Sequence, residues 1–183
     1  MRAPSLILAV LLSATAAAPL RGQALGPSAT GPAIDGFGPV FQVENPDFAT
    51  PVGEYRMAFE VALGAENPGD LNSHIVSLAR FLNMHTQAGV PRENLKLALV
   101  LHGTAAKDAL DHVGYRSRYG IDNPNYDLIQ ALEGFGVQVI LCGQSQMSRG
   151  LERERLAPGV KVALSAMTAI ATLQSQGYNL LSF

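Results

Sequence analysis

The sequence predicts an α/β sandwich in which helices cover a mostly parallel sheet of about five strands. Two short runs, Leu95–Leu101 and Val137–Leu141, are almost continuously apolar. Such runs are typical of parallel strands that are covered on both faces. Segments with apolar residues three and four positions apart alternate with the strand-like runs, and this alternation indicates βα units with right-handed crossovers.

The first part of this body contains two expected strands with a helix between them. Residues 55–63 place Met, Phe, Val and Leu at alternate positions, as a half-buried strand does. Asp70 or Asn72 can cap the next helix, whose apolar positions recur every three or four residues until a glycine and a proline stop it near Ala88. The second strand, Leu95–Leu101, follows.

The middle of the chain is expected to add a short helix, a longer helix and the third strand. Residues 105–113 look helical, whereas residues 115–122 fit neither pattern. Asn123-Pro124-Asn125 is an N-cap signal for a helix that ends by Gly136. The third strand, Val137–Leu141, begins directly after it.

The last part of the chain repeats the alternation. Residues 144–151 suggest a short helix, and residues 160–164 a fourth strand. Ser165 can cap a helix over residues 166–176, and residues 178–183 complete the sheet as its last strand.

The first 53 residues differ from this pattern. Residues 1–24 have the basic start, the apolar stretch and the small-x-small site of a secretory signal peptide, with cleavage after Ala24 preferred over Ala18. The apolar stretch is shorter than the roughly 20 residues that span a bilayer, so a permanent anchor is the weaker alternative. Residues 25–53 are rich in Gly and Pro but also carry apolar side chains, which indicates an extended arm docked on the body or on a neighbouring subunit. Residues 54–183 would then be one α/β domain of a periplasmic or secreted protein.

The composition limits the kinds of partner. The chain has 13 Lys and Arg against 15 Asp and Glu, and signal cleavage would remove two of the arginines. Since neither a basic tail nor a basic cluster is present, nucleic acid and anionic membrane surfaces are not expected partners.

Motifs of several common enzyme classes are missing. The chain contains no phosphate-binding loop, no dinucleotide-binding glycine pattern, no Cys-x-x-Cys pair, no His-Glu-x-x-His and no Gly-x-Ser-x-Gly. An NTPase, a nicotinamide enzyme or a hydrolase is therefore disfavoured. His102 and His112, ten residues apart, are the nearest approach to metal-ligand spacing, and this signal is weak. Neither a metal nor a cofactor is expected.

Cys142 is the single cysteine and directly follows the third expected strand. One cysteine cannot form an internal disulfide, so it is buried and inert, bonded to another chain, or reactive. His102 follows the second strand. If the two strands are neighbours, both side chains lie at the carboxyl edge of the sheet, where open α/β folds bind ligands. A nearby imidazole and backbone amides would favour the thiolate, which is the nucleophile.

The candidate site centres on Cys142, with His102 as its candidate support. The amides that follow the cysteine could stabilise a thiolate or a terminal persulfide sulfur, and Gly143 would let a partner approach closely. The simpler interpretation is that Cys142 is a small buried hydrophobe and that Asn125 belongs to a helix cap. The residues expected to line the pocket are Gly103, Asn125, Gly143, Gln144 and Ser145.

A series of short stretches carries a resemblance: Arg80-Phe81-Leu82-Asn83, Ala88-Gly89-Val90, Leu97 to Gly103, Asn123-Pro124-Asn125, Gly136-Val137, Leu141 to Gln144, Pro158-Gly159-Val160 and Gln176-Gly177-Tyr178. In order and spacing they resemble the DsrE/DsrF-like sulfur-relay proteins, especially an exported, single-domain, YchN-like branch. The resemblance covers Tyr55 to Phe183. It implies a three-layer, flavodoxin-like fold that assembles into trimers or hexamers. It also implies that Cys142 carries sulfur as a persulfide.

Two functions are consistent with these features. The first is sulfur or thiol handling at Cys142, at most a sulfurtransferase-type activity, with a protein donor and acceptor of sulfur. The second is a non-catalytic oligomeric binding module with a structural cysteine, which the lack of a second cysteine and of an acid–base pair supports. A pKa of Cys142 well below the reference of about 8.5 favours the first function.

Overall fold

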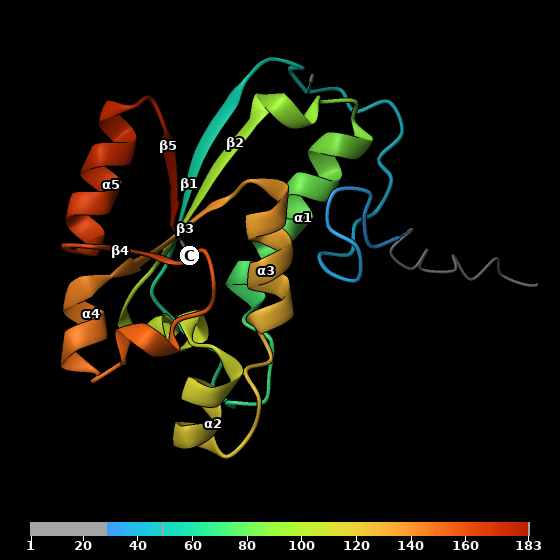
Figure 1. The fold of residues 1–183 in the computed structure, drawn as a ribbon. Helices are drawn as coiled ribbons and strands as arrows, with labels where there is room; N and C mark the ends of the chain where they lie inside the picture. Colours follow the sequence, from blue (N-terminus) through green and yellow to red (C-terminus); the bar gives the residue numbers. More distant parts are fainter. Residues whose placement is uncertain (1–28, 49, 183) are drawn as a thin grey trace, which may run out of the picture.

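The computed structural model describes residues 29–48 and 50–182, and in these residues one five-stranded sheet has the order β4-β3-β2-β1-β5 (Figure 1). Every neighbouring pair of strands is parallel. The expected α/β fold with about five strands is therefore confirmed, and the described sheet is wholly parallel. The strands are β1 (Tyr55–Val61), β2 (Leu95–Leu101), β3 (Gln138–Cys142), β4 (Lys161–Ala163) and β5 (Asn179–Ser182).

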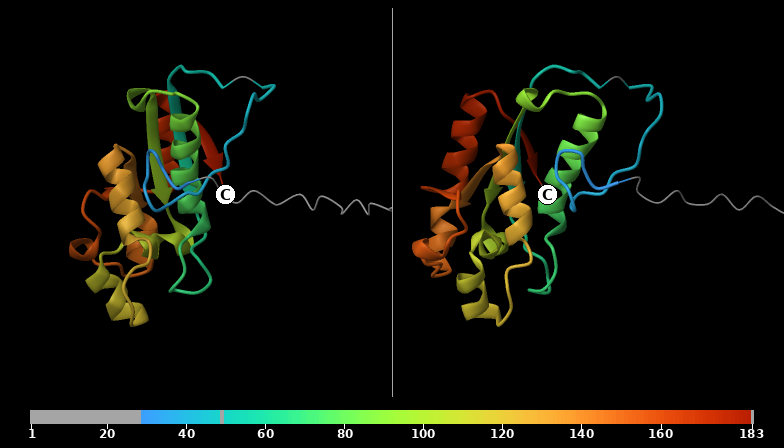
Figure 2. Two further views of the ribbon diagram at one scale, coloured as in Figure 1. Left: turned by 90° about the vertical axis from the view of Figure 1, so that its right-hand side faces the viewer. Right: turned by 45° about the vertical axis from the view of Figure 1, so that its right-hand side comes forward.

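Helices cover both faces of the sheet and make the fold a three-layer sandwich. Figures 1 and 2 show α1 and α3 on one face and α5 on the other, with α4 on the same side as α5. The α-helices are α1 (Ser73–Gln87), α2 (His112–Tyr119), α3 (Tyr126–Phe135), α4 (Gly143–Ser148) and α5 (Ala166–Ser175). Three 3₁₀ helices accompany them: η1 (Arg92–Asn94), η2 (Gly103–Ala109) and η3 (Arg153–Arg155).

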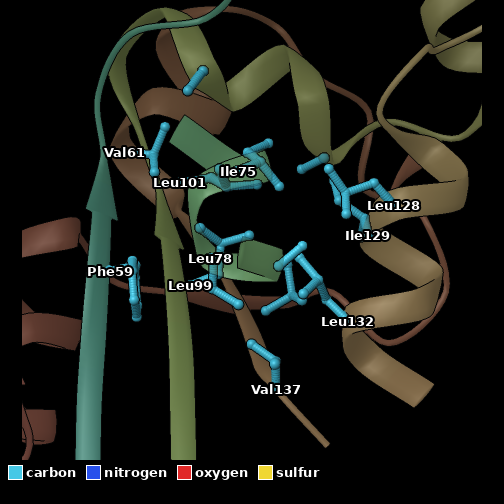
Figure 3. Close-up of a cluster of buried hydrophobic side chains, with 14 of the residues drawn as sticks. Phe59, Val61, Ile75, Leu78, Leu99, Leu101, Leu128, Ile129, Leu132 and Val137 are labelled. Atoms are coloured by element: carbon cyan, nitrogen blue, oxygen red, sulfur yellow. The ribbon is translucent and has the colours of Figure 1, made fainter. Parts of the chain in front are cut away.

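The larger core lies between the sheet and the pair α1 and α3. Alternate residues of β1 and β2, including Phe59 and Leu99, meet Leu78 of α1 and Leu132 of α3 in this layer (Figure 3). Each of these side chains is at most 1% exposed. Truncating one such leucine to alanine costs about 2–5 kcal/mol, so this layer supplies much of the stability of the domain.

A smaller cluster lies on the opposite face, beneath α5. Most of its side chains are small, which lets the helix lie close to the sheet. Because side chains alternate along a strand, β2 sends Ala98 and Val100 to this face and its leucines to the other. We call this group the α5-side cluster; its buried members are Ala58, Ala98, Val100, Cys142, Ala166, Ala169 and Leu173.

The segment after β2 differs from the expected short helix at residues 105–113. Residues 103–109 form the 3₁₀ helix η2, and α2 begins at His112, where Asp111 accepts a hydrogen bond from the amide of Gly114. The helix α2 also includes much of the stretch 115–122 that fitted neither pattern. Its sequence pattern is weak because α2 buries only Gly114 and Tyr115, whereas η2 is buried along most of its length.

The described part of the arm packs against α1. The side chain of Asn83 accepts hydrogen bonds from the amides of Ala33 and Ile34 at 3.0 and 2.8 Å. Its amide group donates to the carbonyls of Ile34, Phe37 and Gly38. Ile34 is 2% exposed and belongs to the larger core.

The expected signal peptide, residues 1–24, lies outside the described residues. Among the residues that are described, no helix combines the length and the apolar character that a membrane crossing requires.

Candidate functional site

Cys142 is the last residue of β3 and the N-cap of α4, so its thiol lies at the carboxyl edge of the sheet. The strand β3 pairs with β2 as the site hypothesis requires, and Leu101 lies opposite Leu141 in the last register pair. His102 and Cys142 are the next residues of their respective strands. Both backbones are extended at these positions.

The sulfur of Cys142 is surrounded by hydrogen-bond donors. The amide of Ser145 donates to Sγ at 3.4 Å, and the amides of Gln144 and Ala166 and the hydroxyl of Ser145 are also directed at it. Burial raises the pKa of the Cys142 thiol, but these hydrogen bonds outweigh it, so the pKa lies below its ordinary value. The turns that begin α4 and α5 thus favour the thiolate.

The hydroxyl of Ser145 is itself held in place by Gly103. The amide of Gly103 donates to Ser145 Oγ at 3.0 Å, which leaves the hydroxyl proton free to face the sulfur. Gly103 has φ +53°, and a Cβ at this position would lie 2.6 Å from the carbonyl oxygen of Ala62. Only glycine fits this turn, and it brings the end of β2 to the turn that holds the thiol.

Gly143 has a different role from the one expected. A Cβ on this residue would lie 2.6 Å from the carbonyl oxygen of Ala163 in β4. The space that the glycine leaves open is therefore used by the chain's own backbone, and an approaching partner does not find it free. Gln144 donates from its side chain to the carbonyl of Leu164 at 3.3 Å, so it ties the same turn to the end of β4.

His102 is engaged with a carboxylate that the sequence did not single out. Its Nε2 lies 2.9 Å from Oε1 of Glu60 in β1, and Ser182 of β5 donates to Oε2 of the same carboxylate at 2.6 Å. About a quarter of each of the His102 and Glu60 side chains is exposed. No hydrogen bond joins His102 to Cys142 within residues 29–48 and 50–182. Glu60 could have been noticed as the one acidic residue within the described strands.

Asn125 does not join the residues around the thiol. Its side chain is fully buried, accepts a hydrogen bond from the amide of Asn72 at 2.8 Å and donates to Asp108 Oδ1 at 3.3 Å. The physical reason is the position of α3, which covers the face of the sheet opposite to α5. The pocket role expected of Asn125 is therefore replaced by a structural one.

Asp108 is the centre of this second group, which we call the Asp108 cluster (Asn72, Lys107, Asp108, Asn123 and Asn125). Its carboxylate accepts from Lys107 Nζ and from Asn72 Nδ2, both at 2.8 Å. Asn123 donates to the backbone carbonyls of Asp108 and Leu110. Burial acts to lower the pKa of Lys107, but the charge of Asp108 and the hydrogen bonds of the ammonium group outweigh it and raise the pKa. The cluster holds η2 against α1 and α3.

The described residues contain no group of three or more His, Cys, Asp and Glu side chains that could hold a metal ion. Cys142 is the free cysteine at the carboxyl edge of the described sheet. The sequence profile of the DsrE/DsrF-like family matches residues 57–183. The chain belongs to the DsrE/DsrF-like family.

Solved structures agree with this family fold. The ychN protein of E. coli is 20% identical and superposes with a TM-score of 0.53 over 70% of this chain and 99% of its own. A Methanobacterium thermoautotrophicum protein of unknown function is 18% identical, with a TM-score of 0.51 over 71% of this chain and all of its own. These similarities confirm the three-layer, flavodoxin-like fold. No curated protein matches the chain.

The part of the chain that matches the DsrE/DsrF-like profile includes the whole thiol site. Glu60, His102, Cys142 and Ser182 all lie between residues 57 and 183. The arm described over residues 29–48 precedes the matched region.

Proposed function

We propose that this DsrE/DsrF-like protein is a sulfur carrier that holds a persulfide on Cys142. The observation that carries the proposal is the set of donors around Sγ, which lowers the pKa of a thiol that burial alone would raise. A thiolate is the form that attacks sulfur, and its pKa controls how much of it exists near neutral pH.

The transfer needs no metal or redox cofactor. The thiolate of Cys142 attacks the outer sulfur of a donor persulfide, and a new bond forms between that sulfur and Sγ. The bond between the two donor sulfurs breaks, its electron pair leaves with the donor thiolate, and a proton converts this thiolate to a thiol. The amides of Gln144, Ser145 and Ala166 would stabilise the negative charge of the bound persulfide as they stabilise the thiolate.

The proposal also includes the location, the assembly and the partners of the carrier. The expected signal peptide supports a periplasmic or secreted location, and the exposed apolar side chains of the arm, Phe41, Val43 and Phe48, support assembly into a trimer or hexamer. A protein donor and a protein acceptor would then exchange sulfur with Cys142.

A second candidate is a non-catalytic oligomeric binding module with a structural cysteine. The observation in its favour is burial, because Cys142 is only 5% exposed. Most free cysteines with this degree of burial act as small hydrophobic side chains.

Mass spectrometry of the intact protein after incubation with glutathione persulfide separates the two candidates. The carrier should gain one sulfur atom that is absent from Cys142→Ser, the matched control that removes the single thiol. If the wild-type protein gains no sulfur and the folded protein also resists alkylation, the thiol is structural and the binding module stands.

A further inference from the structure

Both oxygens of the Glu60 carboxylate are engaged at the carboxyl edge of the sheet. Oε1 is 2.9 Å from His102 Nε2, and Oε2 accepts the hydroxyl proton of Ser182 at 2.6 Å. Glu60 and Ser182 belong to the neighbouring strands β1 and β5, and His102 directly follows β2, the neighbour of β1 on its other side. The carboxylate is thus held between a histidine on one side and a serine on the other.

This arrangement selects one tautomer of His102. An ionised carboxylate only accepts hydrogen bonds, so Nε2 must carry the proton that it donates to Glu60. The other ring nitrogen, Nδ1, then has a free lone pair in the neutral ring, and no hydrogen bond reaches Nδ1 from the described part of the chain.

His102 and Cys142 belong to the same face of the sheet. Even-numbered residues of β2, such as Val100, lie in the α5-side cluster together with Cys142. His102, the next even-numbered residue, continues this alternation. The last register pair of β2 and β3 is Leu101 and Leu141, so His102 and Cys142 each come directly after it. Adjacent strands are about 5 Å apart, so residues 102 and 142 are neighbours at the strand ends.

We propose that Glu60 is a positioning residue for the thiol chemistry, because it holds His102 with Nδ1 free to accept the proton of Cys142. This inference rests on the proposed function as a sulfur carrier. The thiol proton passes to Nδ1, the thiolate takes the outer sulfur of the donor persulfide, and the imidazolium returns the proton to the departing donor thiolate. Atoms and charge balance without an oxidant or reductant.

We considered whether other ionisable groups could replace Glu60 as the partner of His102. Neither α4 nor α5, the helices on this side, carries an ionisable side chain. Lys107 and Asp108 of η2 are paired with each other in the Asp108 cluster. Lys161 lies in register with Glu60 but three strands away, on β4.

The test compares Glu60→Gln with the wild type in two assays: the rate of Cys142 alkylation by iodoacetamide as a function of pH, and the rate of sulfur uptake from glutathione persulfide. We expect the alkylation profile to move to higher pH. We expect uptake at neutral pH to fall about tenfold, less than the 10² to 10⁴ that a complete acid–base group contributes. In a His102→Gln background, Glu60→Gln should cause no further loss, because Glu60 acts through His102.

Glu54→Gln is the matched control. Glu54 pairs with Arg56 at the amino end of the same strand, so the substitution removes the same kind of group away from the thiol. The pH profile of alkylation and the rate of sulfur uptake of this variant should both match those of the wild type. The inference is overturned if Glu60→Gln also matches the wild type, or if its effect persists undiminished without His102.

Two outcomes distinguish this inference from the proposed function. If sulfur uptake occurs and Glu60→Gln leaves both assays unchanged, the carrier stands and the role of Glu60 is rejected. If sulfur uptake fails but the alkylation profile shifts as expected, Glu60 positions His102 although the thiol is no carrier. Should Glu60→Gln not fold, ¹⁵N chemical shifts of His102 in the wild-type protein decide, since an Nδ1–H tautomer overturns the inference and an Nε2–H tautomer supports it.

Discussion

The amide of Gly103 donates a hydrogen bond to the hydroxyl of Ser145 at 3.0 Å, and this contact connects the end of β2 to the turn that holds Cys142. The two residues are 42 positions apart in the chain. With its acceptor position used in this way, the Ser145 hydroxyl donates toward the sulfur and helps to lower the pKa of the thiol.

Ser145→Ala should therefore raise the pKa of Cys142. A hydrogen bond to a charged group contributes about 1.5 kcal/mol or more, so the rate of alkylation at a pH below the thiol pKa should fall about tenfold. The pH dependence of the iodoacetamide reaction measures this. Ser148→Ala is the control, because Ser148 is exposed on the same helix and its hydroxyl donates only to the carbonyl of Ser145. Equal rates for wild type and Ser145→Ala would reject the role of the hydroxyl.

The lowered pKa of Cys142 also predicts how stability depends on pH. Between the thiol pKa of the folded state and the higher one of the unfolded state, the unfolded chain binds more protons, so stability rises with pH. This contribution is complete above the unfolded pKa and is lost as the pH falls through the folded pKa. Urea unfolding at several pH values should show this rise in stability for the wild type and not for Cys142→Ser.

Gly143→Ala should destabilise the domain. The new Cβ would lie 2.6 Å from the backbone carbonyl of Ala163, which cannot move without disturbing β4. Overpacking of this kind costs about 1–3 kcal/mol, measured as a lower midpoint of urea unfolding. Gly134→Ala in α3 is the control, since nothing lies within 4 Å of the added atom. Its helix should become more stable by about 0.5–1 kcal/mol. A Gly143→Ala protein as stable as the wild type would contradict the close approach.

Asp108→Asn should be one of the more damaging polar substitutions. It leaves the ammonium of Lys107, whose side chain is 11% exposed, without its carboxylate partner. Removing one partner of a buried ion pair lowers the free energy of unfolding by about 3–5 kcal/mol. In Asp122→Asn the exposed pair with Arg116 is broken instead, and the cost should be below about 1 kcal/mol. Calorimetric unfolding of the two variants tests the difference, and similar losses in both would show that the buried pair is not ionised.

Asn83→Ala should release the arm from α1. The substitution removes five hydrogen bonds to the backbone of Ala33, Ile34, Phe37 and Gly38. We expect the free energy of unfolding to fall by about 3 kcal/mol, because several buried backbone groups lose their hydrogen-bond partner. Proteolytic cleavage near residue 34 should also become faster. Ser77→Ala, on an exposed part of the same helix, is the control for both measurements. Unchanged cleavage would mean that apolar contacts alone hold the arm.

Much of the fold could be predicted because its signals are local. The apolar runs at Leu95–Leu101 and near Val137–Leu141 form the central strands. Ser165 is an N-cap as its residue type predicts, and of the two candidate caps Asp70 and Asn72 the structure uses Asn72. The helix α2 was missed because it buries only two residues and shows little periodicity. The boundary between η2 and α2 depends on Asp111, whose capping bond can be seen only in three dimensions.

The order of residues alone predicts that Cys142 and His102 each follow a buried strand, since strand ends are marked by local changes in hydrophobicity. It also determined that the chain is an α/β protein with one thiol. The three-dimensional structure alone shows that Asn125 lies away from the thiol, that Glu60 pairs with His102 and that Ser182 donates to Glu60. Glu60 is 42 residues from His102 and 122 from Ser182, and such contacts depend on strand order and on which face of the sheet each side chain occupies. A local pattern does not encode those two properties, because they are set by the packing of the helices against both faces of the complete sheet.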